Sequence, residues 1–297
     1  MRAARAGRPV PPRALVRELD RILTGVVAAT DRVIGLPHPT AGSLHRLHRE
    51  LRRLRSGLAI WEQLLDPRER ERLKPLDRRL KRLARLVGRI RDRDIAIQLL
   101  AHIDQPEWPP EEIARLAEFR TQQRDDARTG RELLRAFLRA ERASQLFEAV
   151  AGRWRAPRVR YRVRDVRDVL RRACERGEER VRSAHRTARK KPTVARMHRL
   201  RLRVRSLRHV TDLARTLDPT HTPPTPALRR RLQAELGRLH DLDVVLGSIA
   251  PGVGETAWAD LLRDQRKELR HALRASLRSR PRPTPGASRA PLRAERS

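Results

Sequence analysis

Apolar residues recur along most of the chain at intervals of three and four positions. One such run is Leu44, Leu47, Leu51, Leu54 and Leu58. Residues with this spacing share one face of an α-helix. Proline and glycine residues divide the chain into intervals of about the length of a helix. The pattern predicts eight helices, with a break in the fourth near Gly130, over residues 12–34, 41–65, 68–102, 109–153, 161–190, 193–217, 225–250 and 255–279.

Two segments of the first half of the chain recur in the second half. Residues 44–65 align with 197–218 at an offset of 153, and residues 86–97 align with 235–246 at an offset of 149. The segments follow in the same order in both halves, which indicates a duplicated helical unit. Together with the helical periodicity, this repeat predicts an all-α fold of two pseudo-symmetric four-helix bundles.

The expected boundaries follow from the repeat and from the ends of the helical pattern. The first bundle spans residues 13–156, and the second spans residues 157–279. The segments 1–12 and 280–297 are rich in arginine, alanine and proline and have few apolar side chains. We expect both of these segments to be disordered basic tails.

Composition narrows the class of fold and of partner. Aromatic residues make up only 3% of the 297 residues, which argues against a β-sandwich or a β-barrel. The formal net charge is +34, and arginine accounts for 65 of the 70 basic residues. The guanidinium group is a planar donor fork that matches the oxygens of a phosphate. The expected partner is therefore a polyanion.

Cysteine usage and hydropathy indicate a compartment. Cys174 is the only cysteine, so an intrachain disulfide is impossible and a reducing compartment is favoured. The chain opens without an apolar stretch long enough for a signal peptide, and no run approaches the ~20 apolar residues of a membrane span. We expect a cytoplasmic protein without a membrane partner.

The first repeated segment carries basic residues on one side of its helix. In both copies they stand at relative positions 0, +3, +7 and +10, which fall within an arc of about 80° on a helical wheel. Such a stripe is about 15 Å long, enough to meet several successive phosphates. Two stripes that face one another form a positively charged groove. The stripes are His45, His48, Arg52 and Arg55 in the first copy and His198, Arg201, Arg205 and Arg208 in the second.

The second repeated segment carries two aspartates separated by one residue. On a helix these two side chains point about 200° apart, so they cannot chelate one metal ion without local unwinding. We expect ion pairs that orient arginine side chains, or contacts between helices. The segments also lack the ligand set of a zinc site, and we expect no metal or other cofactor. The residues in this supporting role are Arg91, Asp92 and Asp94 in the first copy and His240, Asp241 and Asp243 in the second.

The two segments together resemble the CHAD domain, a histidine-containing α-helical domain. The pattern H-x-L-[RH]-x-x-h-R-x-L-R occurs twice, and L-G-x-h-[RH]-D-x-D-h follows each copy, with Val87 in place of the leucine in the first. Residues 132–154 are similar to the fourth helix of the family, so the resemblance covers about residues 12–279. It implies two helical bundles related by a pseudo-twofold axis, with a basic central channel that binds inorganic polyphosphate. It also implies association with polyphosphate granules.

Carried over by position, the resemblance assigns the basic stripes to the ligand. His48 departs from the family pattern, which prefers arginine there, so we expect the charge of the first half to be weaker and more dependent on pH. Arg53 matches a double-basic position of the family, whereas its counterpart Ser206 does not. The candidate polyphosphate-binding residues are His45, His48, Arg49, Arg52, Arg53, Arg55, His198, Arg201, Arg205 and Arg208.

Three functions compete at this point. Polyphosphate binding is the leading hypothesis, and non-specific binding of nucleic acid is the alternative that the net charge and the basic tails favour. A catalytic role in polyphosphate or nucleotide metabolism is supported by the paired aspartates alone. The chain has no Walker loop, no G-x-S-x-G and no H-E-x-x-H motif. It also lacks the E-x-E-x-K signature of the triphosphate-tunnel hydrolases to which many relatives are fused, so we expect a stand-alone binding module and no enzyme.

Overall fold

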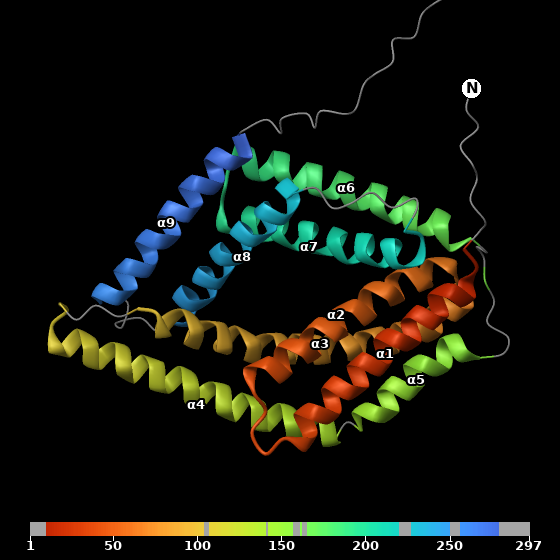
Figure 1. Cartoon of the computed structure of the whole chain (residues 1–297), viewed down its shortest axis with the longest axis horizontal. Coiled ribbons are helices and arrows are strands. Elements are labelled where there is room, and N and C mark those ends of the chain that lie inside the picture. The colour runs from red at the N-terminus through yellow and green to blue at the C-terminus, as the bar shows by residue number, and fades with distance from the viewer. Residues whose placement is uncertain are drawn as a thin grey trace, which may run out of the picture.

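The structure is a computed structural model. It describes residues 10–103, 107–140, 142–156, 161, 165–219, 227–249 and 256–278, except for the side chains of 227–229 and 278. Within these residues the chain forms nine helices and one isolated β-bridge, between Leu65 and Tyr161 (Figure 1). The helices are α1 (Pro12–Gly35), α2 (Ala41–Leu64), α3 (Pro67–Ala101), α4 (Pro110–Ala140), α5 (Ala143–Arg155), α6 (Val166–Lys190), α7 (Val194–Leu217), α8 (Ala227–Ser248) and α9 (Ala257–Arg278).

Threonine caps fix the first turns of α2 and α7, the two helices that carry the basic stripes. The hydroxyl of Thr40 accepts a hydrogen bond from the backbone N–H three residues further on (3.2 Å), and Thr193 does the same in α7 (3.4 Å). Caps of this kind satisfy an N–H group of the first turn. His45 and His198 each follow their cap by five residues, so both stripes begin in the same register.

The two halves repeat one order of packed helices. In the first half α1 packs against α2, α2 against α3, and α3 against α4; in the second half α6, α7, α8 and α9 follow the same order. The helix α5 is an addition to the first half, where it packs against α1, α3 and α4. The expected all-α fold is confirmed, but the first half holds five helices rather than four. A duplication of the sequence stays a prediction.

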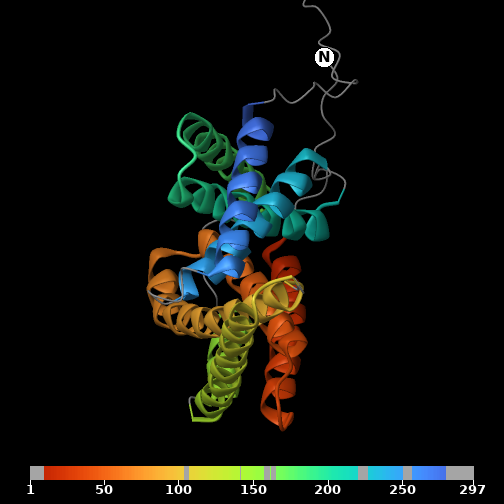
Figure 2. The same ribbon diagram turned by 90° about the vertical axis from the view of Figure 1, so that its left-hand side faces the viewer.

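Three apolar clusters hold these helices together. The first lies within α1–α5 and also takes in the start of α6 and the end of α7. The second joins α3 and α4 to α8 and α9, and the third lies within α6–α9. The halves are thus joined by apolar contacts at two places, and Figures 1 and 2 show α9 reaching from the second half towards α4. Along the described part of the chain, no helix combines the length and the apolarity needed to span a bilayer.

The predicted fourth helix, residues 109–153, is broken, but the predicted position of the break near Gly130 is wrong. The chain breaks at Arg142, whose φ of 43° is left-handed, and α4 and α5 lie on either side of it. Gly130 instead lies inside α4, where a Cβ atom would stand 3.2 Å from Cγ1 of Ile90 on α3. This glycine therefore permits the close approach of two helices and does not end one.

The last residues of the predicted N-terminal tail, 10–12, are ordered, so the prediction of a disordered segment 1–12 is wrong there. Val10 is buried in the first apolar cluster, and its N–H donates a hydrogen bond to the Asp165 carboxylate (3.2 Å). The Val166 N–H in turn donates to the Val10 carbonyl (2.9 Å), which ties the start of α1 to the start of α6. The remaining predicted tails, residues 1–9 and 280–297, lie outside the described residues. The expected boundary between the bundles, at 156/157, falls where the described residues stop, because residue 157 is not among them.

Candidate functional site

Four arginine side chains from three helices meet where the two halves face one another. They are Arg52 of α2, Arg91 of α3, and Arg201 and Arg205 of α7, called the arginine cluster below. Burial and then the charges of the other three lower the pKa of Arg52 to about 9. Burial, followed by Arg201 and Arg91, likewise lowers the pKa of Arg205 to about 10. The four guanidiniums therefore repel one another in a partly buried place.

Most of the arginine cluster makes no hydrogen bond or ion pair within the described residues. This holds for Arg52, Arg201 and Arg205. Arg91 donates a hydrogen bond from Nε to Nδ1 of His45 (3.2 Å), which is an uncharged acceptor at neutral pH. Charged groups that are partly removed from water normally have a counter-ion, so this arrangement indicates a place for an external anion.

Two aspartates lie close to the arginine cluster, Asp92 on α3 and Asp241 on α8. Burial raises the pKa of both carboxyl groups, and the nearby arginines oppose that rise. Asp92 favours the charged forms of Arg52, Arg201 and Arg205. Two carboxylates thus face four guanidiniums, which leaves an excess of positive charge.

Five histidines surround the arginine cluster and repeat one contact in both halves. His45 touches Arg91, and at the matching positions of the second half the rings of His198 and His240 lie 5.3 Å apart between centroids. His48 of α2 and His209 of α7 complete the set. The Nδ1 of His48 and the Nε2 of His209 are buried without a hydrogen-bond partner among the described residues. Both nitrogens therefore have unused hydrogen-bonding capacity beside the arginine cluster.

These histidines are uncharged at neutral pH. Burial and then Arg52 lower the pKa of His48 to about 3, and burial with Arg205 lowers the pKa of His209 to about 4. The pKa of His240 is also lowered to about 3, by burial and then Arg201. In the absence of ligand they are neutral hydrogen-bonding groups, and arginine alone carries the positive charge of the site.

The second aspartate of each pair tethers a helix. Asp94 on α3 forms a salt bridge with Arg131 on α4, and at the matching position Asp243 on α8 accepts a hydrogen bond from Nε of Arg266 on α9 (2.6 Å). Asp94 and Asp243 thus point away from Asp92 and Asp241, as the helical spacing predicts. Within the described part of the chain, no group of three His, Cys, Asp or Glu side chains is placed to hold a metal ion.

Three predicted ligand residues lie apart from the arginine cluster. Arg53 forms ion pairs with Glu50 (3.0 Å) and Glu18 (3.8 Å), both of which are buried. Arg49 also pairs with Glu50 (3.2 Å), and Arg208 pairs with Asp212 (3.5 Å). These arginines already have counter-ions within the fold. They line a small cavity of about 110 Å³ between α1, α2 and α7, called the α1 cavity below.

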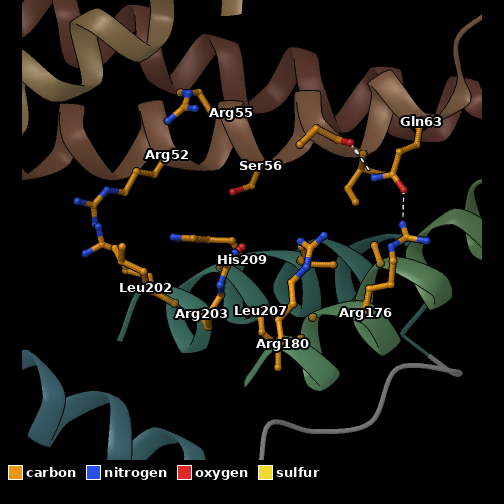
Figure 3. A pocket seen from close by; sticks show the side chains of 17 residues that line it. Arg52, Arg55, Ser56, Gln63, Arg176, Arg180, Leu202, Arg203, Leu207 and His209 are labelled. Atoms are coloured by element: carbon orange, nitrogen blue, oxygen red, sulfur yellow. Dashed lines mark hydrogen bonds between the residues drawn. The ribbon is translucent and has the colours of Figure 1, made fainter. Parts of the chain in front are cut away.

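A larger cavity of about 490 Å³ opens between α2, α6 and α7 and is called the α6 cavity below (Figure 3). Ser56 and His209 point into it from opposite walls. Sequence reasoning missed His209, which aligns with Ser56 in the first copy and so does not repeat, and it missed the arginines from α6, which lie outside both repeated segments. Arg55, which pairs with Asp77 (3.5 Å), also lies here. The arginines that line the α6 cavity are Arg52, Arg55, Arg176, Arg180, Arg203 and Arg205.

Comparison with known proteins agrees with the all-α fold. The family model of the CHAD domain matches residues 19–250. The chain belongs to the CHAD domain family. Its structure is similar to the crystal structure of the CHAD domain from the plant Ricinus communis, with a TM-score of 0.65 and 18% identity over 95% of this chain and 97% of that one. PptA from Streptomyces chartreusis is similar with a TM-score of 0.58 and 17% identity, over 90% and 96% of the two chains. No curated protein matched significantly.

The ion pair between Asp94 and Arg131, which joins α3 to α4, predicts that removal of the carboxylate lowers the stability of this CHAD domain, and that removal of metal ions does not. Asp94→Ala leaves Arg131 without its partner in a place where the Arg131 side chain is only 20% exposed. We expect the free energy of unfolding to fall by about 3 kcal/mol in urea denaturation. The control Asp125→Ala removes an exposed pair with Arg128 and should cost less than ~0.5 kcal/mol. A loss of the same size in the wild type on addition of EDTA would contradict the tether and indicate a metal site.

The unbalanced charge of the arginine cluster predicts that one arginine destabilises the free CHAD domain. The folded-state pKa of Arg52, about 9, lies below its ordinary value, so at every pH below about 9 its charge opposes folding. Arg52→Met should therefore raise the free energy of unfolding at pH 7 and low salt by about 1 kcal/mol. The control Arg171→Met, at an exposed position of α6, should leave it unchanged. A fall in stability with Arg52→Met would show that Arg52 has a counter-ion within the fold.

Proposed function

We propose that this CHAD domain binds inorganic polyphosphate, a linear polyanion, in the arginine cluster. The observation that carries the proposal is the set of partly buried guanidiniums at Arg52, Arg201 and Arg205, which form no hydrogen bond or ion pair within the described residues and outnumber the nearby carboxylates. Their mutual repulsion is an unfavourable energy in the free protein, and a bound anion offsets it. Membership of a family associated with polyphosphate-related ligands supports the same conclusion.

An extended anion fits the site better than a single phosphate. The arginine cluster draws its side chains from α2, α3 and α7, and the α6 cavity continues it with Arg176, Arg180 and Arg203. Each guanidinium offers several N–H donors in a fixed plane, which suits the oxygens of successive phosphate groups. The neutral histidines around the arginine cluster add hydrogen bonds at its edge.

The proposed role is binding without turnover. The arginine cluster offers charge and hydrogen-bond donors, which are the groups that binding of a polyanion needs. Such a module would carry the protein to the place where polyphosphate accumulates, and we propose association with cytoplasmic polyphosphate granules.

Removal of two central arginines tests the site directly. Arg52→Ala combined with Arg205→Ala should raise the Kd for long-chain polyphosphate about 100-fold, because a hydrogen bond to a charged group contributes about 1.5–3 kcal/mol. Fluorescence titration at physiological salt measures the Kd, and circular dichroism checks that the helices remain. The matched control removes the same charge from exposed positions, with Arg128→Ala and Arg171→Ala. An equal effect of the two double variants would refute the placement of the site.

Polyphosphate binding should take up protons below neutral pH. His48, His209 and His240 have folded-state pKa values of about 3 to 4 because they are buried and lie near arginines. A bound polyanion favours their charged forms and raises these pKa values towards 6.5. Affinity should therefore increase as the pH falls from 7 to 5, and calorimetry in two buffers should detect protons taken up on binding.

The variant His209→Gln provides the control for this proton linkage. It should reduce the proton uptake while it leaves the affinity at pH 8 within about threefold, since the imidazole is uncharged there. An affinity that does not change between pH 7 and pH 5 would contradict the placement of the histidines beside the ligand.

A further inference from the structure

Three cavities lie around the arginine cluster, and each offers a phosphate chain a way out of it. The α6 cavity and the α1 cavity share Ser56 and His209 as lining residues, so these two side chains stand between them. The third cavity, of about 660 Å³, lies beside His198 and His240 and has the carboxylate of Asp243 in its lining. A chain longer than the arginine cluster can continue into one of these cavities, and the charges that line them decide which one suits an anion.

The α1 cavity does not suit an anion. Its lining includes the carboxylates of Glu18 and Asp212 beside Arg49, Arg53 and Arg208. These three arginines are ion-paired with Glu18, Glu50 or Asp212 at 3.0–3.8 Å. An incoming phosphate chain has to approach these carboxylates or break their ion pairs. The α1 cavity is also small, about 110 Å³.

The α6 cavity has the opposite balance of charge. Six arginines line it, and no carboxylate does so among the described residues. Arg180 and Arg203 form no hydrogen bond or ion pair with any residue in the described ranges, and Arg176 donates to the neutral amide of Gln63. Only Arg55 has a carboxylate partner, Asp77 at 3.5 Å. The excess of positive charge on its lining favours an anion in the α6 cavity.

The fold holds the α6 arginines at a fixed distance from α7. A Cβ atom on Gly177 would stand 2.9 Å from Cδ1 of Leu207, so the glycine lets α6 approach α7 closely. Arg176 and Arg180 are four residues apart on α6, which puts them on the same side of that helix. Figure 3 shows both at the cavity, together with Leu207 in its wall.

We propose that a bound phosphate chain leaves the arginine cluster through the α6 cavity, where Arg176 and Arg180 contact it and set the preference for long chains. The inference rests on the proposed function. A short chain occupies the arginine cluster and does not reach α6, whereas a long chain gains contacts with both arginines. The affinity for long chains should therefore depend on α6, and the affinity for short chains should not.

The test compares tripolyphosphate with long-chain polyphosphate on the full chain. Arg176→Ala combined with Arg180→Ala should raise the Kd for the long chain about tenfold and reduce the slope of log Kd against log salt by about two, because two phosphate contacts are lost. The Kd for tripolyphosphate should stay the same. The matched control, Arg49→Ala combined with Arg208→Ala, removes the same charge from the α1 cavity and should change neither affinity.

Each other outcome overturns a definite part of the account. A loss of affinity for tripolyphosphate as large as that for the long chain would place α6 in the primary site and overturn its role in length preference. A larger effect of the control would show that the chain runs through the α1 cavity. Should the alanine variant unfold, Arg176→Gln with Arg180→Gln gives the same comparison with the stems of the side chains kept. Failure of the wild type to bind either chain refutes the proposed function instead.

Discussion

The repulsion between arginines at the junction of the two halves is the constraint on which the rest of the structure depends. Arg52, Arg201 and Arg205 are partly buried and form no hydrogen bond or ion pair within the described residues. Burial lowers the pKa of each, neighbouring arginines lower it further, and the nearby Asp92 and Asp241 offset only part of this effect. Such an arrangement persists only where other contacts over-determine it. Here apolar clusters join the halves at two places, through α6 and α7 to the first core and through α8 and α9 to α3 and α4. The burial of these apolar side chains thus offsets the repulsion between the arginines and holds the site in place without a bound anion.

In each aspartate pair, one carboxylate faces the arginine cluster and the other forms an ion pair that joins two helices. Asp92 and Asp241 face the arginines and reduce the excess charge, while Asp94 and Asp243 fasten α3 to α4 and α8 to α9. Because these side chains lie on opposite sides of one helix, the same short motif can orient the site and hold the outer helices. The histidines are neutral hydrogen-bonding groups in the free protein, and a bound polyanion would favour their protonated, charged forms.

Helical periodicity and the internal repeat predict most of the fold and the centre of the site, since both are local properties of the chain. The same reasoning did not separate Arg52 from Arg53 or Arg205 from Arg208. The pairs Arg53–Glu50 and Arg208–Asp212 are local to one helix and could have been read from their spacing, whereas Glu18 on α1 is brought near Arg53 by the tertiary fold. Sequence reasoning also missed Arg176 and Arg180, which belong to no repeated motif. Gly130 was misread for a similar reason: its role is contact with Ile90 on a neighbouring helix, which the sequence does not display.

The central claim is that a built site, and not the net charge of +34, selects the ligand. The most direct measurement is a competition titration at physiological salt, in which unlabelled polyphosphate and duplex DNA each displace labelled long-chain polyphosphate at matched concentrations of charge. A preformed arginine cluster predicts that polyphosphate displaces the label at a concentration at least about tenfold lower than DNA, because a duplex is too wide for cavities of this size. Equal displacement per charge would contradict the claim, since any cationic surface gives that result.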